Sequence, residues 1–234
     1  MPRLLYSEEN YPGAAGKSTG GSSRPRAAGH SMAAMEQQLQ QLLGTISNPQ
    51  LQELARVFRQ APYYQAFCLA PAAQSYHHNH RGGLLQHSLG TARIVLKIAE
   101  LYPEIDRDLL LLGAILHDVG KVKEMECGGD GITYTDEGKL LGHIVLGLQM
   151  LERLMEQTTL DEVTRTKLLH LVASHHGRHE WQSPRKPQFV EAKILHLADM
   201  MDAEIWKYQS ARPSAPGSDW SAYMRSIGSE VYLR

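Results

Sequence analysis

The stretch LLLLGAILHDVGK, residues 109–121, decides how the rest of the sequence is interpreted. Its first eight residues leave almost no polar face, which indicates a helix that is buried on all sides. His117 and Asp118 follow directly, at the inner end of this core helix. A buried carboxylate is unfavourable unless it is paired, hydrogen-bonded or bound to a metal. The stretch therefore predicts a polar site at the end of a core helix.

Composition and charge set the broad class of the protein. The chain has 234 residues, of which 42% are hydrophobic and 21% charged, as in a globular domain with a sizeable core. The formal net charge of -1 gives no overall basic field, so contact with nucleic acid would need a local patch. Cys68 and Cys127 cannot build a disulfide framework. Because there is no membrane-length apolar run and no signal peptide, we expect a cytoplasmic protein without membrane contact. The sequence does not indicate an oligomeric state.

Three segments are expected along the chain. Residues 1–32 are rich in Gly, Ser, Ala and Arg, cannot bury enough apolar surface to fold, and are predicted to be a disordered extension. Residues 33–210 predict one helical domain. Residues 211–234 predict a mostly irregular tail, with a short helix after Asp219. No stretch is a convincing strand, so the predicted fold class is all-α.

The expected helices follow from apolar periodicity and from capping residues. They cover residues 35–46, 49–60, 84–101, 109–116, 139–156, a segment after 162 that ends near Gly177, and 190–208. Thr159 and Glu162 predict a capping box before the sixth helix. The helix over 139–156 is expected to turn one stripe inward, made of Leu140, Ile144, Leu148, Leu151 and Met155. The glycine-rich segment 127–138 is predicted to be a loop.

Metal-capable side chains recur on the expected inner faces of five helices. They are His87, His117 with Asp118, His143, His175 and Asp199. A single buried histidine is more often a core residue that is hydrogen-bonded to a carbonyl. Five such positions are poorly explained as polar residues that are buried for unrelated reasons. Imidazole nitrogen and carboxylate oxygen are the ligands that borderline cations choose. The pattern predicts a metal centre.

Asp118 is interpreted as a bridge, because the two oxygens of a carboxylate can hold two cations about 3.5–4 Å apart. The predicted ligands are His87, His117 and Asp199 for one cation, and His143, His175 and His176 for the other. Neighbouring helical residues diverge by about 100°, so His175 and His176 both reach the site only because Gly177 ends their helix. Mixed His and Asp ligation disfavours magnesium and calcium and leaves manganese, iron, nickel and zinc open.

This order of residues resembles the HD-domain superfamily of metal-dependent phosphohydrolases, and more closely the HD domain of the YhaM-type 3′–5′ exoribonucleases. The likeness covers residues 61–204, and its most specific blocks are TDEGKLLGH (135–143) and SHHGRHEWQSPRKP (174–187). The family's longer members carry an N-terminal OB-fold, whereas the residues before His87 predict a tail and helices. HD phosphodiesterases of cyclic dinucleotides carry Gly-Tyr-Pro after the paired histidines, and this chain has GRHEW there.

The resemblance implies a helical bundle around a binuclear metal site, two divalent cations with manganese the expected activator, and cleavage of phosphodiester bonds in single-stranded RNA. It implies Asp118 and Lys121 as catalytic residues, since Lys121 matches the lysine that faces the phosphate in related enzymes. The alternative for Lys121 is a solvated lysine near a helix C-terminus, where the helix dipole favours it.

Candidate substrate residues flank these blocks. His78, within HHNH (77–80), could contact substrate at the rim, or could belong to a solvated loop. Arg178 and Arg185 could meet phosphates, or could be surface charges. Trp181 could stack on a base, or could pack under its own loop. Asp202 could hydrogen-bond a ligand histidine, or could form a surface salt bridge.

Three functions stay open on the sequence. The leading one is a 3′–5′ exoribonuclease-like nuclease acting on single-stranded RNA or oligonucleotides. The second is a hydrolase of nucleotides or other small phosphate esters. The third, from another class, is a metal-bound sensor or interaction module without turnover.

Overall fold

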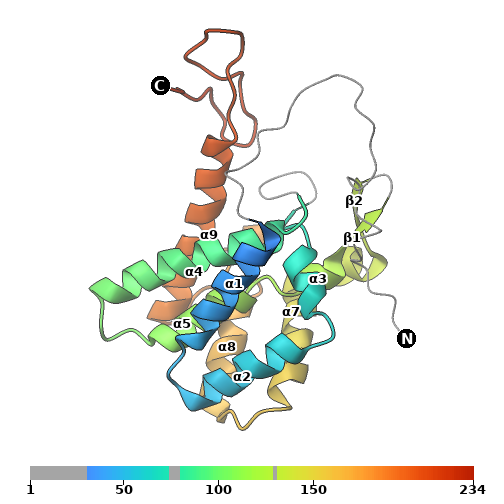
Figure 1. Cartoon of the computed structure of the whole chain (residues 1–234), viewed down its shortest axis with the longest axis vertical. Coiled ribbons are helices and arrows are strands. Elements are labelled where there is room, and N and C mark those ends of the chain that lie inside the picture. The colour runs from blue at the N-terminus through green and yellow to red at the C-terminus, as the bar shows by residue number, and fades with distance from the viewer. Residues whose placement is uncertain (1–30, 74–79, 129–130) are drawn as a thin grey trace.

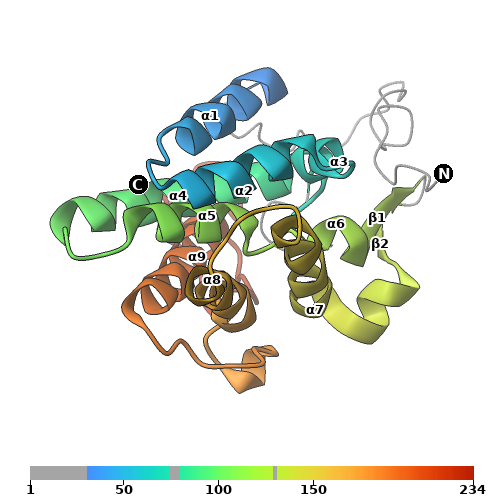
Figure 2. The ribbon, with the colours of Figure 1, turned by 90° about the horizontal axis from the view of Figure 1, so that it is seen from below.

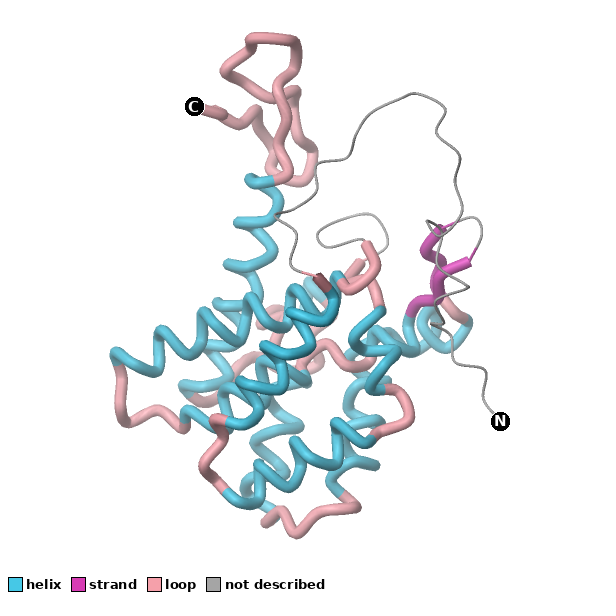
Figure 3. The backbone as a smooth tube through the Cα atoms, in the orientation of Figure 1, coloured by secondary structure: helices cyan, strands magenta, loops and turns pink. Residues whose placement is uncertain are grey.

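A computed structural model describes residues 31–73, 80–128 and 131–234. Within these ranges the chain is a bundle of helices with one small hairpin (Figures 1 and 3). The elements are α1 (Met32–Gly44), α2 (Pro49–Gln60), α3 (Tyr64–Leu69), α4 (Gly83–Leu101), α5 (Arg107–Leu116), α6 (Lys121–Glu124), β1 (Met125–Gly128), β2 (Gly131–Tyr134), α7 (Asp136–Met155), α8 (Glu162–Ser174), the short 3₁₀ helix η2 (His179–Trp181) and α9 (Val190–Gln209). The prediction of an all-α fold is confirmed. The predicted extension falls almost entirely on residues 1–30, which lie outside the described residues, as does His78.

Helix α5 is the centre of the bundle. Every residue from Leu109 to Leu116 is buried, which confirms the prediction that this helix has no exposed face. It packs against α2, α4, α8 and α9, and Figure 2 shows it between α2 on one side and α8 and α9 on the other. Full burial of each leucine side chain contributes about 1.5–3 kcal/mol. The residues that follow α5 are therefore held at a fixed place inside the molecule.

Side-chain caps fix where the helices begin. Asn48 Oδ1 accepts from the N–H groups of Gln50 and Leu51 at the start of α2, as expected for an N-cap. At α8 the prediction of a capping box was wrong. Asp161 is the N-cap and accepts from two backbone N–H groups of the first turn, both at 3.0 Å. Thr159 instead donates to Glu53 on α2, so its hydroxyl ties the α7–α8 turn to another helix.

A two-stranded hairpin stands where the sequence predicted a loop without strands. β1 pairs with β2 antiparallel, with Met125 opposite Tyr134 and Cys127 opposite Ile132. Met125 and Cys127 are buried and the residues after each of them are exposed, which is the alternation of a strand. Each strand is only four residues long, and burial alternates in β1 but not in β2, so the hairpin has too short a pattern to be recognised from the sequence.

Helix α7 begins earlier than predicted and is broken near its start. Gly142 has φ 70° and ψ 161°, which no helical residue adopts. The break changes the direction of the side chains before it, so Leu140 is 82% exposed and does not belong to the inward stripe. Ile144, Leu151 and Met155, after the break, are buried as predicted.

The last turns of α9 project beyond the bundle and lead into the tail (Figures 1 and 3). Residues 211–234 form turns and isolated bridges, such as Pro213 with Ser221 and Trp220 with Tyr232. The short helix expected after Asp219 is not present, because these bridges hold the segment extended. Among the described helices, none combines the length and apolarity that crossing a bilayer requires.

Candidate metal centre

Five segments from distant parts of the sequence meet at one place in the bundle. The residues that they bring together are His87 on α4, His117 and Asp118 after α5, His143 on α7, His175 and His176 after α8, and Asp199 on α9. These are the seven residues that the sequence pointed to as metal ligands. They form two groups of three with Asp118 between them.

The first group, called the His87 group, consists of His87, His117 and Asp199. One donor atom of each lies within 4.8 Å of the others. Nε2 of His87 is 3.1 Å from Oδ1 of Asp199 and 3.2 Å from Nε2 of His117. Two imidazole nitrogens and a carboxylate oxygen thus converge on one point.

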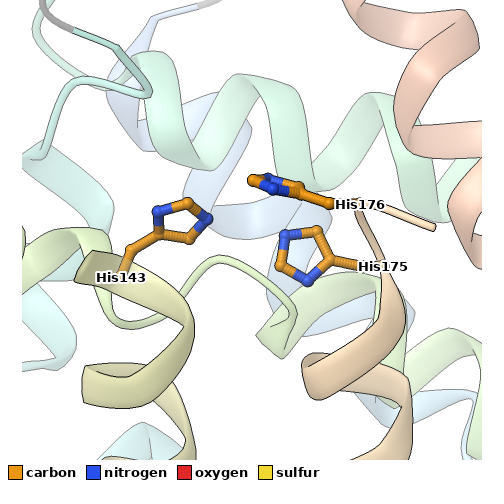
Figure 4. A group of neighbouring side chains, drawn as sticks. All are labelled: His143, His175 and His176. Carbon is orange, nitrogen blue, oxygen red and sulfur yellow. The ribbon is translucent and has the colours of Figure 1, made fainter. Parts of the chain in front are cut away.

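The second group, called the His143 group, consists of His143, His175 and His176, whose donor atoms also lie within 4.8 Å of one another. Figure 4 shows the three rings facing one another, His143 from the helical run that follows the break in α7 and the other two from the end of α8. His175 is the residue after the last residue of α8, and Gly177 follows the pair with φ 75°. The helix therefore ends where both histidines can turn toward the site.

Asp118 lies between the two groups and turns one oxygen to each. Oδ2 is 3.7 Å from Nε2 of His87 and 3.4 Å from Nε2 of His117. Oδ1 is 3.5 Å from Nε2 of His143 and 3.6 Å from Nε2 of His175. This is the arrangement that a carboxylate needs in order to bridge two cations.

Unpartnered buried atoms gather at the same point. Among the described residues, Oδ1 of Asp118, Nε2 of His143 and Nε2 of His175 are buried without a hydrogen-bond partner. Leaving such atoms unpaired is unfavourable, and one of them is a carboxylate oxygen. All three can only accept when the imidazoles carry their hydrogen on Nδ1. The donor set therefore fits a divalent cation.

Backbone carbonyls fix that hydrogen for three of the histidines. Nδ1 of His117 bonds to the carbonyl of Ala114 at 2.8 Å, and Nδ1 of His175 to that of Val172 at 2.7 Å. His176 bonds in the same way to the carbonyl of Trp181. Because a carbonyl can only accept, Nδ1 must donate in each pair, which leaves the Nε2 lone pair for a ligand.

Carboxylates take the place of carbonyls at the other two histidines. Nδ1 of His87 is 2.7 Å from Oδ2 of Asp202, which is the hydrogen bond that the sequence suggested. Nδ1 of His143 is 3.0 Å from Oε1 of Glu124. Glu124 was missed by the sequence analysis, because only its position shortly after Lys121 hints at it and the contact joins residues 19 positions apart.

A further histidine was also missed. His196 on α9 is buried, and its Nδ1 donates to the carbonyl of His175 at 2.8 Å. Its ring fills the space beside Gly177, where an added Cβ would lie 2.3 Å from it. The imidazole of His196 thus supports the bend at Gly177 that directs His175 and His176 toward the site. His196 lies three residues before Asp199 in the sequence.

The carboxylates give the His87 group a strongly negative environment. Burial would lower the pKa of His87, but hydrogen bonds to Asp199 and Asp202 and the charge of Asp118 raise it to about 10. Burial opposes ionisation of Asp118, but the charges of Lys121 and His117 hold the pKa of that carboxyl well below its usual range. The carboxylates that hold a proton on His87 would equally attract a cation, which would take the place of that proton.

The His143 group is electrically different. Burial lowers the pKa of His175, and burial together with repulsion from the protonated form of His175 lowers the pKa of His176 to about 4. Both imidazoles are therefore neutral at pH 7. Neutral imidazoles have their lone pairs available to a metal without first losing a proton.

Lys121 is buried, so the alternative of a solvated lysine was wrong. Its exposure is 8%, and its Nζ lies 2.6 Å from Oδ2 of Asp118. The adjacent charge of Asp118 raises the pKa of this lysine against the opposing effect of burial. A fixed positive charge therefore stands beside the bridging carboxylate.

The candidate substrate residues lie in different places. Trp181 is 43% exposed, and the Arg178 guanidinium lies over its ring at 4.8 Å. Trp181 is connected to the centre through its carbonyl, which accepts from His176. Arg185 is exposed on the following loop, and its backbone N–H bonds to Ala173 rather than to any residue of the two groups. His78 lies outside the described residues.

Comparison with known proteins agrees with this geometry. The HD domain family model matches residues 84–204, more than half of the chain. The chain therefore belongs to the HD-domain family, and its class is that of the metal-dependent phosphohydrolases. No solved structure gives a significant match to it.

Several curated proteins are similar to the chain, each named 3′-5′ exoribonuclease YhaM. The protein of Shouchella clausii is 42% identical over 200 residues, covering 86% of this chain and 62% of the relative. That of Bacillus subtilis is 41% identical over 165 residues, covering 70% and 52%. That of Listeria innocua is 39% identical over 171 residues, covering 73% and 54%. The chain thus spans between about half and three fifths of the length of these relatives.

Proposed function

We propose that the chain is a two-metal phosphodiesterase that removes nucleotides from the 3′ end of single-stranded RNA. The observation that carries this proposal is the position of Asp118, whose two oxygens face two separate groups of nitrogen and oxygen donors. A single structural metal would need only one such group. Two adjacent groups around a shared carboxylate are typical of hydrolases that act on phosphate esters.

In this proposal the His87 group and the His143 group each hold one divalent cation, and Asp118 is a ligand of both. The mixed nitrogen and oxygen donors suit manganese, iron, nickel or zinc, of which we propose manganese. When bound, such cations lower the pKa of water and neutralise negative charge on the phosphate.

The chain's own residues account for the rest of the chemistry. Asp118 holds the centre together and orients the ammonium group of Lys121 at 2.6 Å. Lys121 supplies a positive charge to a phosphate oxygen as negative charge develops there. Water oxygen bonds to phosphorus, the bond between phosphorus and the 3′ oxygen of the preceding nucleotide breaks, and that oxygen takes up a proton. The products are a nucleoside 5′-monophosphate and a strand one nucleotide shorter.

RNA is proposed as the substrate on two grounds. The similar proteins are named exoribonucleases, and the likeness to the protein of Shouchella clausii covers 86% of the chain. In addition, Trp181 and Arg178 form an exposed pair next to His176, which gives a base a surface for stacking and a phosphate a cation.

The test is incubation of the purified chain with a 5′-labelled single-stranded oligoribonucleotide and Mn²⁺. A ladder that shortens from the 3′ end, with nucleoside 5′-monophosphates identified by mass spectrometry, is the expected result. Asp118→Ala should abolish the ladder, because it removes the bridge between the groups. Asp136→Ala is the matched control, since the Asp136 side chain is 98% exposed and should leave the ladder unchanged.

Other outcomes would contradict the proposal in different ways. Hydrolysis of nucleotides or of bis-p-nitrophenyl phosphate, with the RNA left intact, would favour a hydrolase of small phosphate esters. Two bound Mn²⁺ per chain without any turnover would indicate a metal-bound sensor or interaction module. Cleavage that persists in Asp118→Ala would show that the activity does not depend on the bridging carboxylate, and would overturn the proposal.

A further inference from the structure

Glu124, the last residue of α6, makes two contacts with the same residue of α7. Its Oε1 accepts from the backbone N–H of His143 at 3.0 Å and lies 3.0 Å from the imidazole Nδ1 of His143. Glu124 is only 8% exposed, so these contacts are shielded from water. A single carboxylate oxygen thus fixes both the main chain and the ring of one proposed metal ligand.

The backbone contact depends on the break in α7. In a continuous helix the N–H of His143 would bond to the carbonyl of Lys139, four residues earlier. Gly142, with φ 70° and ψ 161°, interrupts the helix and makes His143 the first residue of a new helical run. The N–H is then directed at Glu124. A carboxylate is also favoured at that position by the dipole of the helical run that follows.

Glycines on both segments hold the two residues at this distance. A Cβ on Gly120, before α6, would lie 1.9 Å from the carbonyl oxygen of His143. A Cβ on Gly138, in α7, would lie 2.1 Å from the carbonyl oxygen of Glu124. The main chains of the two segments are therefore in direct contact on both sides of the Glu124–His143 pair. Any larger residue at either position would separate carboxylate from imidazole.

The contact also decides which nitrogen of His143 faces the centre. An ionised carboxylate has no hydrogen to donate, so Nδ1 of His143 must hold the hydrogen of that bond. Nε2 is then a pure acceptor, and it is the atom that lies 3.5 Å from Oδ1 of Asp118. In the His143 group, the other two rings are oriented by backbone carbonyls, so His143 is the member that a side chain orients.

We propose that Glu124 is the positioning residue of the His143 group: it selects the Nδ1–H form of His143 and aims Nε2 at the cation of that group. The inference rests on the two-metal centre of the proposed function and deepens it, by naming the residue on which one of the two ions depends. Removing Glu124 should weaken the ion of the His143 group and leave that of the His87 group in place.

The experiment is a Mn²⁺ titration of the full chain, with free Mn²⁺ followed by electron paramagnetic resonance. The unaltered chain should bind two ions. Glu124→Ala should retain one and bind the other about 10–100-fold more weakly, the usual effect of removing a carboxylate behind a ligand histidine. Glu124→Gln keeps a carbonyl oxygen for both N–H groups and should restore most of the affinity. Glu126→Ala, on the exposed neighbour in β1, is the matched control and should bind both ions normally.

A second measurement does not depend on any variant. Imidazole ¹⁵N shifts of the metal-free chain should report the hydrogen of His143 on Nδ1. A hydrogen on Nε2 overturns the inference even if Glu124→Ala does not fold. Two ions bound by Glu124→Ala with unchanged affinity also overturn it, and leave the proposed function standing. An unaltered chain that binds fewer than two ions overturns the two-metal centre and the inference together.

Discussion

Nδ1 of His87, on α4, lies 2.7 Å from Oδ2 of Asp202, which stands three residues after Asp199 on α9. Helix α9 therefore contributes two residues here: Asp199 is a member of the His87 group, and Asp202 contacts the Nδ1 side of the His87 ring. Oδ1 of Asp202 lies against Gly90, where a Cβ would be 2.0 Å away, so its carboxylate is held in place between the two helices.

Asp202→Ala should weaken the binding of one of the two cations by about 10–100-fold, because His87 loses the partner that orients its ring. The measurement is calorimetric titration of the chain with Mn²⁺. Asp136→Ala, at an exposed side chain, is the control and should match the unaltered chain. Equal affinities in Asp202→Ala and the control would show that the pair does not act on the metal.

Lys121→Met should lower kcat on the oligoribonucleotide by about 10²–10³-fold, as removal of one group that stabilises developing charge does. Both cations should still bind, because Lys121 is not one of the proposed ligands. Its ammonium group competes with the cations for the carboxylate of Asp118. Single-turnover rates and a parallel Mn²⁺ titration separate these effects. Lys123→Met, two positions away, is the control, and an equal loss there would exclude a specific role for Lys121.

Gly142→Ala should lower the free energy of unfolding by about 1–3 kcal/mol, since an alanine at φ 70° and ψ 161° is strained. The added Cβ would meet no atom of another segment within 4 Å, so the effect reports the local backbone conformation. Urea unfolding followed by circular dichroism measures it. Gly44→Ala, also without neighbours but with a negative φ, should not destabilise the chain; a loss of equal size there would refute the explanation.

Stability should decline in alkaline solution. Burial raises the pKa of the Cys68 thiol to about 12 and of the Cys127 thiol to about 11, and it raises the pKa of Tyr63 and Tyr64 as well. These groups stay protonated when folded, whereas an unfolded thiol ionises near pH ~8.5 and an unfolded tyrosine near ~10. The folded state then binds more protons, so the free energy of unfolding falls as pH rises above ~8.5.

Urea midpoints at neutral, mildly alkaline and strongly alkaline pH check this expectation. A Cys68→Ala, Cys127→Ala double variant should show a shallower decline, because the two thiols no longer contribute to the difference in bound protons. Midpoints that are flat across this range would contradict the assignment of buried, neutral thiols.

Local patterns were enough to predict most helices and the residues of the two groups. The apolar run before His117 has no polar face, and burial of that helix follows from composition alone. Asn48 and Pro49 mark the start of α2 in the sequence as they do in the structure. The candidate ligands could be found because helical periodicity places them on the same faces as core residues.

Features that depend on contacts between segments could not be predicted in this way. The inward direction of Leu140 was inferred from an unbroken helix, and Gly142 removes that condition. Thr159 and Asp161 are both plausible caps, and Glu53 on another helix decides between them by binding Thr159. Glu124 has no periodic signal at all, since its importance arises only from the main-chain contact between α6 and α7.

The two oxygens of Asp118 have unequal surroundings, and this bears on how a preparation of the protein would behave. Oδ2 lies beside the ammonium of Lys121, on the side of the centre that contains Asp199, whereas Oδ1 faces the imidazoles of His143 and His175. Carboxylate-rich sites suit harder ions such as manganese, and imidazole-rich sites suit zinc or nickel. We therefore expect the two halves to lose manganese to competing zinc or nickel to different degrees. Elemental content would then follow the growth medium and the purification history, and specific activity would vary with both.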